Sequence, residues 1–564
     1  METVRFDEYA TIHENSIAIK ATEQDFMNIR EHFHSKEALL KRDHTLRGGV
    51  VVGIDGHIIE VQARAVSLLR TPADLCRVTT ITGMPQKPTK EVLNRIQGAF
   101  VKLGIPRSKV SVMINLAPAG LPKEGTWLDL PIAIIMLQAA GFLPEMDQKN
   151  KESKVLIGEI GLHGDIRKVR GTLAIAFATG ANQEIIVPRG NENECTFIRY
   201  HPDYGNNYIL SASTLEEVIG YFNDDNKLSH GDEGGITFKS AIDRPVDFGK
   251  IRGQQKAKDA ALICAAGGHN LLMIGPPGEG KSLLAKAIPG ILPRLTKSEI
   301  VELTRIYSAC DKLGDSKAII RRPMRVINST ASVSSIIGGG SKIPHPGEIT
   351  LAHLGVLFMD EFPEFSRGAL ENLRHPMESG SVHISRVNAS LEFPARFTLV
   401  AAMNPCPCGN SGAGTCWCTE NAVTKYQSRI SGPILDRIDL QVELGRLSTE
   451  ERFAESEEDQ SPRMQEEVQR ARSRQEKRFK GTGIPFNAAI PAGEVREYCC
   501  FSTEGFEYYK KVVVENSIST RSMDRLAKVA RTIADIRDTD EVQRNDIKEA
   551  ASFVIGGMLR DAMK

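Results

Sequence analysis

The residue types best suited to chemistry are concentrated at Gly275-Pro276-Pro277-Gly278-Glu279-Gly280-Lys281-Ser282. This run fits the pattern G-x-x-x-x-G-K-[ST], in which the backbone N–H groups of a glycine-rich loop surround phosphate oxygens. Lys281 then reaches the β- and γ-phosphates, and the Ser282 hydroxyl ligates Mg²⁺. An apolar stretch, Asn270–Ile274, precedes the loop and a helix-forming stretch, Leu283–Ile288, follows it. We therefore predict a nucleoside triphosphate site.

Two later apolar stretches also run into polar residues that suit phosphate chemistry. Val356–Met359 leads directly into Asp360 and Glu361. A central strand of a parallel sheet is covered on both faces and is apolar throughout, so an acid at its end is placed to meet Mg²⁺. We assign that contact to Asp360 and the polarisation of the attacking water to Glu361. Phe397–Met403 ends in Asn404, which we expect to bond the γ-phosphate or that water.

Length and composition limit the classes of protein to which this chain can belong. The chain has 564 residues, with 41% hydrophobic and 25% charged, as in an ordinary globular protein of roughly three or four domains. Lys plus Arg and Asp plus Glu both number 71, so polyanion contacts must come from local patches. No apolar run approaches the roughly 18 residues of a membrane span, and the start, Met1–Phe6, lacks a signal-peptide core. We expect a cytoplasmic protein without membrane contacts.

The first part of the chain carries both strand and helix patterns. Apolar patterning predicts strands at 49–53, 57–63, 110–116 and 184–188. It predicts helices at 88–102 and 172–180, and a buried helix that ends near Gly141. This order resembles the ribosomal-protein-S5-like domain of Lon proteases, which implies an α+β domain over residues 1–225. Polar, glycine-rich sequence follows, and we assign residues 226–246 to a linker.

This resemblance raises the question whether the domain is a peptidase. Lon-type proteases use a Ser–Lys dyad, in which the lysine helps to deprotonate the serine hydroxyl. Aligning Pro122-Lys123-Glu124-Gly125 with the Pro-Lys-Asp-Gly of that family places Trp127 at the nucleophile position and Lys168 at the lysine position. Because an indole cannot attack a carbonyl, we expect a module for assembly or substrate guidance and not a protease.

The nucleotide motifs together resemble those of AAA+ ATPases, which implies ATP and Mg²⁺ as cofactors. In that family an aliphatic-Arg-Gly-Gln element packs on the adenine, and Ile251 opens such an element here. A Leu-Asp-Arg element matches the arginine finger, so Arg437 is expected to reach the γ-phosphate held by a neighbouring subunit. Arg521 matches sensor 2, with Arg525 as the second choice. The resemblance implies an α/β fold with two further domains, an ATPase core at 247–455 and a helical lid at 456–564.

Segments between the nucleotide-binding motifs indicate which branch of the AAA+ ATPases the chain resembles. An insertion occupies residues 322–355, and a hairpin is predicted just before Phe397 by the apolar residues Val382, Ile384, Leu391 and Phe393. Both are similar to the magnesium-chelatase-like branch of AAA+ ATPases, and the whole chain is identified as a member of the YifB/ComM family. ComM members are hexameric DNA helicases that drive branch migration in natural transformation. The resemblance thus implies a hexameric ring that acts on single-stranded or branched DNA. Val326-Ile327-Asn328 departs from the family's usual Pro-His-His near a pore-facing loop.

Four of the ten cysteines are clustered after the third apolar strand. Cys406 and Cys408 are separated from Cys416 and Cys418 by a short, glycine-containing stretch. Four thiolates suit a closed tetrahedral zinc site, and a reducing compartment disfavours a disulfide. An iron–sulfur cluster would use the same ligands. We predict a structural Zn²⁺ that shapes this loop, with Trp417 as a packing residue or a stacking contact to DNA.

Candidate DNA contacts lie in three segments: Arg386 and Asn388 of the hairpin, Lys342 of the insertion, and a predicted helix at 463–480. The basic residues of this helix are Arg470, Arg472, Arg474, Lys477, Arg478 and Lys480. A charge-rich helix can equally be a solvated face. A second function class is a magnesium-chelatase-type ATPase or another remodeller of a protein or porphyrin complex. Such assemblies need an Asp-x-Ser-x-Ser site, which this sequence lacks, so a partner chain would have to supply it.

Overall fold

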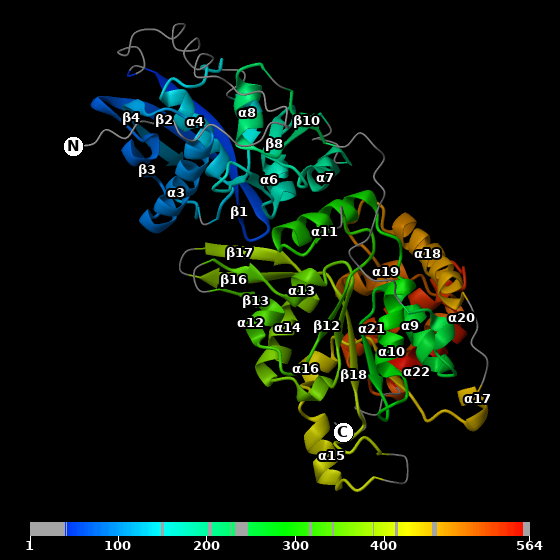
Figure 1. Ribbon diagram of the computed structural model, residues 1–564. Coiled ribbons are helices and arrows are strands. Elements are labelled where there is room, and N and C mark those ends of the chain that lie inside the picture. Colours follow the sequence, from blue (N-terminus) through cyan, green and yellow to red (C-terminus); the bar gives the residue numbers. More distant parts are fainter. Residues whose placement is uncertain are drawn as a thin grey trace.

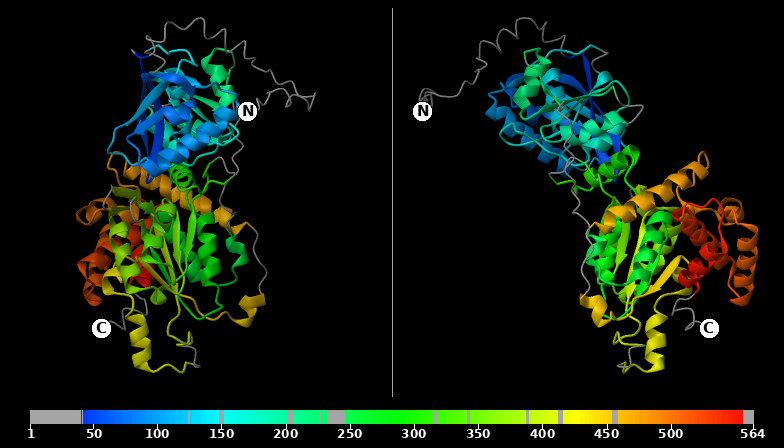
Figure 2. Two further views of the ribbon diagram at one scale, coloured as in Figure 1. Left: turned by 60° about the vertical axis from the view of Figure 1, so that its left-hand side comes forward. Right: turned by 90° about the vertical axis from the view of Figure 1, so that its right-hand side faces the viewer.

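A computed structural model describes residue 40 and residues 42–555, apart from 124, 148–151, 201–205, 226, 232–245, 315–317, 341–342, 387–388, 412–415 and 454–458. Figure 1 shows an N-terminal domain, blue to blue-green, above a larger part coloured green to red. In Figure 2 the larger part has a sheet at its centre with helices on both sides. No helix within the described ranges is both long and apolar enough to cross a membrane.

The N-terminal domain is built on an eight-stranded sheet in the order β10-β9-β8-β5-β1-β2-β4-β3. The bounds are β1 Asp43–Val52, β2 Asp55–Ala73, β3 Thr79–Thr82, β4 Ser108–Ala117, β5 Lys154–Leu156, β8 Glu184–Pro188, β9 Tyr208–Ala212 and β10 Ser229–His230. The four predicted strands are confirmed, the first two as arms of one long hairpin, β1–β2. β10 pairs with β9, so this sheet continues into the stretch predicted as linker.

Helices and one small hairpin complete this domain. They are α3 Gln86–Lys102, α4 Asp129–Ala139, α6 Thr172–Ala178, α7 Glu192–Cys195, α8 Leu215–Phe222, and the strands β6 Glu159–Ile160 and β7 Ile166–Arg167. α4 and α6 pack on β1 and β2. Every residue of α4 is buried, as expected for a helix that is apolar all round. The predicted helices at 88–102 and 172–180 correspond to α3 and α6.

A five-stranded parallel sheet forms the centre of the larger part, in the order β12-β15-β18-β11-β19. The bounds are β11 Leu271–Ile274, β12 Met324–Ile327, β15 Val356–Met359, β18 Thr398–Met403 and β19 Leu440–Glu443. β11 and β15 are buried at every residue, as predicted for strands covered on both faces. Ligands of such sheets bind beyond the carboxyl ends of the strands. A binding site is therefore expected at the carboxyl ends of these five strands.

The two faces of this sheet belong to different cores, because side chains alternate along a strand. Leu271 and Met273 of β11 join a core with α9 Gln255–Gly267 and the C-terminal helices. Leu272 and Ile274 join a core that continues into the N-terminal domain. The C-terminal helices are α18 Gln460–Arg478, α19 Val495–Cys499, α20 Thr503–Glu515, α21 Thr520–Ile536 and α22 Arg544–Val554. This C-terminal part is helical, as expected.

Further helices of the larger part are α10 Lys281–Ala287, α11 Lys297–Ala309, α14 Arg367–Ser379, α15 Glu420–Gln427, α16 Gly432–Leu435 and α17 Thr449–Phe453. The predicted insertion begins with β12, an edge strand of the sheet, and goes on as α12 Val333–Ile337, β13 Gly338–Gly339, β14 His345–Pro346 and α13 Glu348–Leu351. The predicted hairpin before β18 is confirmed as β16 Ser381–Arg386 and β17 Ala389–Pro394, paired antiparallel.

The N-terminal domain contacts both α11 and this hairpin (Figure 1). The backbone N–H of Gly171 donates to Ser308 O at 3.1 Å. Gly53, at the turn between β1 and β2, approaches the hairpin so closely that a Cβ there would lie 2.8 Å from Leu391 Cδ1. The turn between β1 and β2 therefore packs against Leu391 and Phe393 of the hairpin.

Candidate nucleotide site

The glycine-rich loop connects β11 to α10. Gly278 and Gly280 have φ angles of +85° and +87°, and a Cβ added at either position would meet nothing within 4 Å. Residues with a side chain rarely adopt these angles, so the two glycines allow the loop to curl. A curled, glycine-rich backbone of this kind can surround the phosphates of a nucleotide.

Lys281 begins α10 and is largely buried. Its Nζ donates to the carbonyl oxygens of Gly275 at 2.6 Å and Pro276 at 2.8 Å, and to Asn404 Oδ1 at 3.1 Å. Burial lowers the pKa of this ammonium group, and the nearby carboxylate of Asp360 acts in the opposite direction. The contact between Lys281 and Asn404 joins the ends of β11 and β18.

Ser282 and Asp360, the two predicted Mg²⁺ ligands, are in direct contact. Ser282 Oγ donates to Asp360 Oδ2 at 2.7 Å. Oxygen donors of this kind are what Mg²⁺ prefers, so the pair fits that ion. Glu361 follows with φ +51°, and its N–H donates to Asp360 Oδ1 at 2.9 Å. Left-handed backbone at a residue other than glycine is uncommon and concentrates at functional sites.

The order of the strands brings these residues together. β18 lies between β11 and β15 in the sheet, and all three run parallel. Lys281 lies after β11, Asn404 after β18 and Asp360 after β15. The three residues therefore come together at the carboxyl ends of these strands. Two other predicted contacts of the nucleotide are Ile251 and Glu279. Ile251 is buried in the core shared with α9, and Glu279 accepts a hydrogen bond from Leu447 N at 3.3 Å.

The four clustered cysteines lie next to the glycine-rich loop, with all four Sγ atoms within 4.8 Å of one another. Cys406 Sγ lies 3.3 Å from that of Cys408 and 3.7 Å from that of Cys416. Four sulfurs at about 2.3 Å from a tetrahedral zinc ion would stand about 3.8 Å apart, so spacing and donor set fit such an ion. Burial acts to raise the pKa of Cys408, but hydrogen bonds from Asn410 and Cys406 outweigh it and bring that pKa to about 6.

The cysteine loop touches the glycine-rich loop directly. Gly409 has φ +81°, and a Cβ there would lie 2.7 Å from Pro277 Cδ. Trp417, predicted to pack or to stack on DNA, has 76% of its surface exposed. Residues 412–415, between the two cysteine pairs, lie outside the described residues.

Arg437 and Arg521 lie at the amino ends of the strands, on the side of the sheet opposite to the glycine-rich loop. Arg437 precedes β19, and the N–H of Asp439 donates to Asn270 O at 3.1 Å, immediately before β11. Since β11 and β19 are parallel, this is the edge where β11 begins, whereas the glycine-rich loop follows its end. Arg437 Nη2 is bonded to Glu378 Oε1 of α14, and Arg521 Nη2 lies 3.8 Å from the same oxygen. The two arginines therefore gather away from the glycine-rich loop of their own chain.

Arg525, the second choice for sensor 2, is buried. Its Nη1 donates to Leu435 O at 3.0 Å and to Ile438 O at 2.7 Å. These two carbonyls flank Arg437, so Arg525 fixes the turn that carries Arg437. Sequence reasoning found neither this arrangement nor Glu378, because Glu378 and Arg437 are 59 residues apart and no spacing pattern links them.

The two positions that align with the catalytic Ser–Lys dyad of Lon proteases, Trp127 and Lys168, lie at the same cavity. Trp127 and Lys168 line one cavity of ≈ 400 Å³, which reaches Ser308 in the last turn of α11 and Leu313 beyond that helix. Trp127 is 3% exposed, and its Nε1 donates to Arg170 O at 2.7 Å. The indole is thus a buried, hydrogen-bonded part of the cavity wall.

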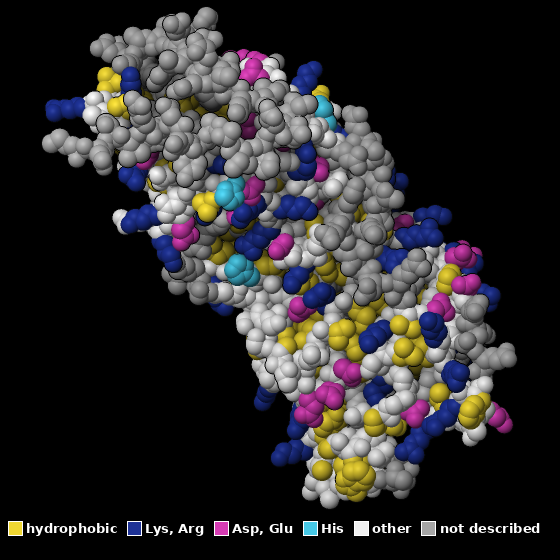
Figure 3. All heavy atoms as spheres, viewed as in Figure 1, with side chains coloured by type: hydrophobic (Ala, Val, Ile, Leu, Met, Phe, Trp, Pro, Cys, Tyr) yellow, Lys and Arg dark blue, Asp and Glu magenta, His cyan; other side chains and the backbone are white. Residues whose placement is uncertain are grey.

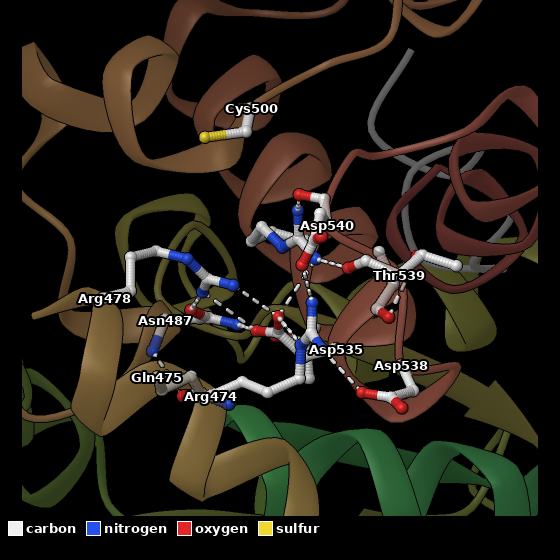
Figure 4. Close-up of polar contacts among 12 residues, drawn as sticks. Arg474, Gln475, Arg478, Asn487, Cys500, Asp535, Asp538, Thr539 and Asp540 are labelled. Carbon is white, nitrogen blue, oxygen red and sulfur yellow. Dashed lines mark hydrogen bonds and ion pairs between the residues drawn. The ribbon is translucent and has the colours of Figure 1, made fainter.

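Basic residues of α18, candidate DNA contacts, are divided between the interior and the surface. Arg474 and Arg478 point towards Asp535 of α21, and Arg478 Nη1 lies 3.0 Å from Asp535 Oδ2 (Figure 4). Arg472 lies over the Phe486 ring at 4.7 Å. These three cations have partners within the fold, so this part of the helix differs from a simple solvated face. The exposed ones are Arg470, Lys477 and Lys480.

The other candidate DNA contacts are only partly described. Arg386 Nε donates to Gly340 O at 3.0 Å, which ties the hairpin to the insertion. Asn388 and Lys342 lie outside the described residues. On the face drawn in Figure 3, the Lys and Arg side chains of the described residues are interspersed with Asp and Glu. This agrees with the balanced charge of the sequence.

Three family models match the chain. They are described as Magnesium chelatase, subunit ChlI (residues 247–452), Subunit ChlI of Mg-chelatase (73–191) and Magnesium chelatase, subunit ChlI C-terminal (458–553). Together with the glycine-rich loop and the parallel sheet, these matches define a magnesium-chelatase-like AAA+ protein. Membership of this class supports ATPase activity with ATP and Mg²⁺.

Relatives that match most of the chain show to which family within this class the protein belongs. The Uncharacterized protein YifB of Escherichia coli (strain K12) is 38% identical over 482 residues, covering 84% of this chain and 91% of the relative. The Competence protein ComM of Haemophilus influenzae is 36% identical over 484 residues, with the same coverage. The Magnesium-chelatase 38 kDa subunit of Cereibacter sphaeroides is 29% identical over 181 residues, 29% of this chain and 53% of the relative. The chain belongs to the YifB/ComM family, as its motifs predicted.

Proposed function

We propose that this protein is an ATP-hydrolysing motor that acts on DNA, as a helicase or branch-migration factor in recombination or natural transformation. The observation that carries ATP hydrolysis is the meeting of Lys281, Asn404 and the Ser282–Asp360 pair at one sheet edge. Lys281 would bind the β- and γ-phosphates, and Ser282 with Asp360 would hold Mg²⁺, which neutralises phosphate charge when bound. Glu361 would orient the attacking water, and Asn404 would bind the γ-phosphate. Other proposed nucleotide contacts are Gly275–Gly280 and, for adenine, Ile251.

The site is completed by a second copy of the chain. Arg437 and Arg521 lie at the opposite edge of the sheet from Lys281, so they are placed to serve a neighbouring copy. Contacts of this head-to-tail kind close into rings, and we propose a homo-oligomeric ring, hexameric as in the ComM resemblance. AAA+ proteins commonly oligomerise, which agrees with this arrangement.

The flanking domains would support the motor. We propose that residues 1–225 form an S5-like domain for assembly or substrate guidance without peptidase chemistry, supported by Trp127 at the nucleophile position. Residues 226–246, apart from β10 at Ser229–His230, which belongs to the N-terminal sheet, would link it to the ATPase core at 247–455. Residues 456–564 would form the helical lid, and its helix α21 carries Arg521.

The DNA proposal is tested by the response of ATP hydrolysis to DNA. We expect single-stranded or forked DNA to stimulate the ATPase activity, and forked DNA to be displaced only when ATP is present. Lys281→Ala is the control that should abolish both effects. If phosphate contacts dominate, log affinity falls with log salt by about 0.7 per contact on single strands and about 0.9 on duplex. ATPase activity that no DNA stimulates would contradict the proposal.

The alternative is a magnesium-chelatase-type ATPase or protein remodeller that works with a partner chain. The observation that favours it is the match of three magnesium chelatase family models. It predicts ATPase activity that responds to a partner protein and not to DNA. The same DNA titration therefore separates the two functions.

We further propose that Cys406, Cys408, Cys416 and Cys418 hold a structural Zn²⁺. The support is the mutual approach of the four sulfurs. Metal analysis of the purified protein should find one zinc per chain and no iron, and replacing Cys406 and Cys408 by serine should remove it. Because Gly409 packs on Pro277, we also expect the loss of metal to weaken nucleotide binding. Iron in place of zinc would favour the iron–sulfur alternative, and unchanged metal content would contradict a site at these cysteines.

A further inference from the structure

Glu378 lies between the two arginines assigned to the neighbouring copy. Its Oε1 is bonded to Arg437 Nη2 and lies 3.8 Å from Arg521 Nη2. The three side chains come from different parts of the chain. Glu378 lies near the end of α14, Arg437 follows α16, and Arg521 belongs to the first turn of α21.

The surroundings hold these groups in place. Arg437 Nη1 donates to Pro433 O at 2.6 Å, and the Arg437 side chain is only 11% exposed. Arg525 fixes the carbonyls on both sides of Arg437. Arg521 and Glu378 are more open, with 54% and 53% of their side chains exposed. Arg437 is therefore a fixed cation, and Glu378 is the carboxylate that binds it.

A carboxylate between two guanidinium groups has a clear electrostatic role. Two like charges repel each other, and a shared anion offsets this repulsion while it sets the orientation of both groups. A guanidinium has five N–H donors, so a bond to Glu378 leaves donors for phosphate oxygens. Charges fixed in advance stabilise a transition state without reorganisation during the reaction.

We propose that Glu378 is a positioning residue for ATP hydrolysis: it holds Arg437 and Arg521 side by side for the triphosphate bound by the neighbouring copy. This role rests on the shared site proposed above. Glu378 would act on the site of the neighbour and not on the site of its own chain, since it lies with Arg437 at the far edge of the sheet.

The first test compares Glu378→Ala and Glu378→Gln with the wild type. We expect kcat for ATP to fall about tenfold or more in both. Affinity for a fluorescent ATP analogue, the oligomeric state and the melting temperature should stay unchanged, which a merely structural role would not predict. Glu507→Gln is the matched control, because Glu507 is an exposed acid on α20 paired with Lys510 at 2.6 Å. Unchanged kcat in Glu378→Ala would overturn the proposal.

The second test mixes variants in equal amounts before activity is measured. Glu378→Ala chains keep an intact Lys281 and Lys281→Ala chains keep an intact arginine cluster, so about one interface in four of a mixed ring is complete. We expect this mixture to regain activity, whereas Glu378→Ala with Arg437→Ala regains none. Recovery in the latter mixture would overturn the proposal.

A mixture of Lys281→Ala with Arg437→Ala separates this proposal from the shared site. If that mixture recovers and Glu378→Ala with Lys281→Ala does not, only the role of Glu378 is wrong. If neither recovers, the shared site is wrong, and the role of Glu378 with it.

Discussion

At the scale of single residues, Lys281, Asn404, Ser282 and Asp360 of the proposed catalytic site are bonded to one another in pairs. Lys281 Nζ bonds Asn404, Ser282 bonds Asp360, and Asp360 accepts the backbone N–H of Glu361. Glu361 has no such side-chain partner among the bonds described, and its backbone is left-handed. This conformation turns the chain sharply after β15, directly next to the proposed Mg²⁺ ligands.

Glu361→Gln should therefore slow the reaction without weakening the binding of ATP. An amide cannot accept the proton of the attacking water, and loss of a general base costs about 10²–10⁴ in rate. We expect kcat to fall within this range while the dissociation constant of a fluorescent ATP analogue stays unchanged. Glu364→Gln is the control, since Glu364 pairs with Arg429 at the surface, at 2.6 Å. Equal kcat values for Glu361→Gln and the wild type would exclude Glu361 as the base.

At the scale of elements, α21 links the C-terminal helices to the arginine cluster. Its first turn carries Arg521, its next turn carries Arg525, and its last turns carry Arg531 and Asp535. Arg531 and Asp535 are fully buried and bonded to each other at 3.0 Å, and Asp535 also accepts bonds from Arg478 of α18. This buried ion network fixes α21 against α18, and thereby the position of the arginines at its other end.

Asp535→Asn should destabilise the protein far more than a change at the surface of the same network. It leaves the fully buried Arg531 and the partly buried Arg478 without their counter-charge, and breaking a buried ion pair in this way costs about 3–5 kcal/mol. Asp540→Asn is the matched control, because Asp540 is 96% exposed and pairs with Arg474. Such a surface pair contributes about 0–1 kcal/mol. Denaturant unfolding of both variants measures the difference, and equal losses of stability would contradict the importance of the buried network.

At the scale of the whole molecule, the sheet separates the two halves of the proposed catalytic machinery. The glycine-rich loop lies at the carboxyl ends of the strands, and the Arg437–Glu378–Arg521 cluster lies near the opposite edge. The N-terminal domain contacts α11 and, through the turn at Gly53, the β16–β17 hairpin.

Lys281→Ala and Arg437→Ala chains should each hydrolyse ATP poorly and should recover part of the activity when mixed. The first chain keeps its arginine and the second keeps its glycine-rich loop, so some interfaces of a mixed ring are complete. Loss of an arginine finger costs about 10³–10⁵ in rate in small GTPases, so recovery stands out against a low background. ATPase activity of the separate and mixed chains is the measurement. A mixture no more active than its components would show that Arg437 does not serve a neighbour.

The sequence by itself determined the features that depend on consecutive or evenly spaced residues. The strand, glycine-rich loop and helix around Lys281 lie in one continuous stretch, and the β16–β17 hairpin follows from alternating apolar residues. The four cysteines lie so close in sequence that a common site could be expected. Local backbone preferences and periodicity decide such features, and both can be read directly from the chain.

Only the tertiary structure decided which distant residues meet. Periodicity does not specify strand order, so the position of β18 between β11 and β15, which brings Asn404 to Lys281, could not be read from the sequence. The same holds for Arg437 and Arg521, which share Glu378 although they come from different helical regions. Basic residues of α18 look alike in sequence, and only packing shows that Arg478 faces Asp535 while Lys477 faces solvent. Long-range pairing depends on how the whole chain packs, and no local pattern encodes it.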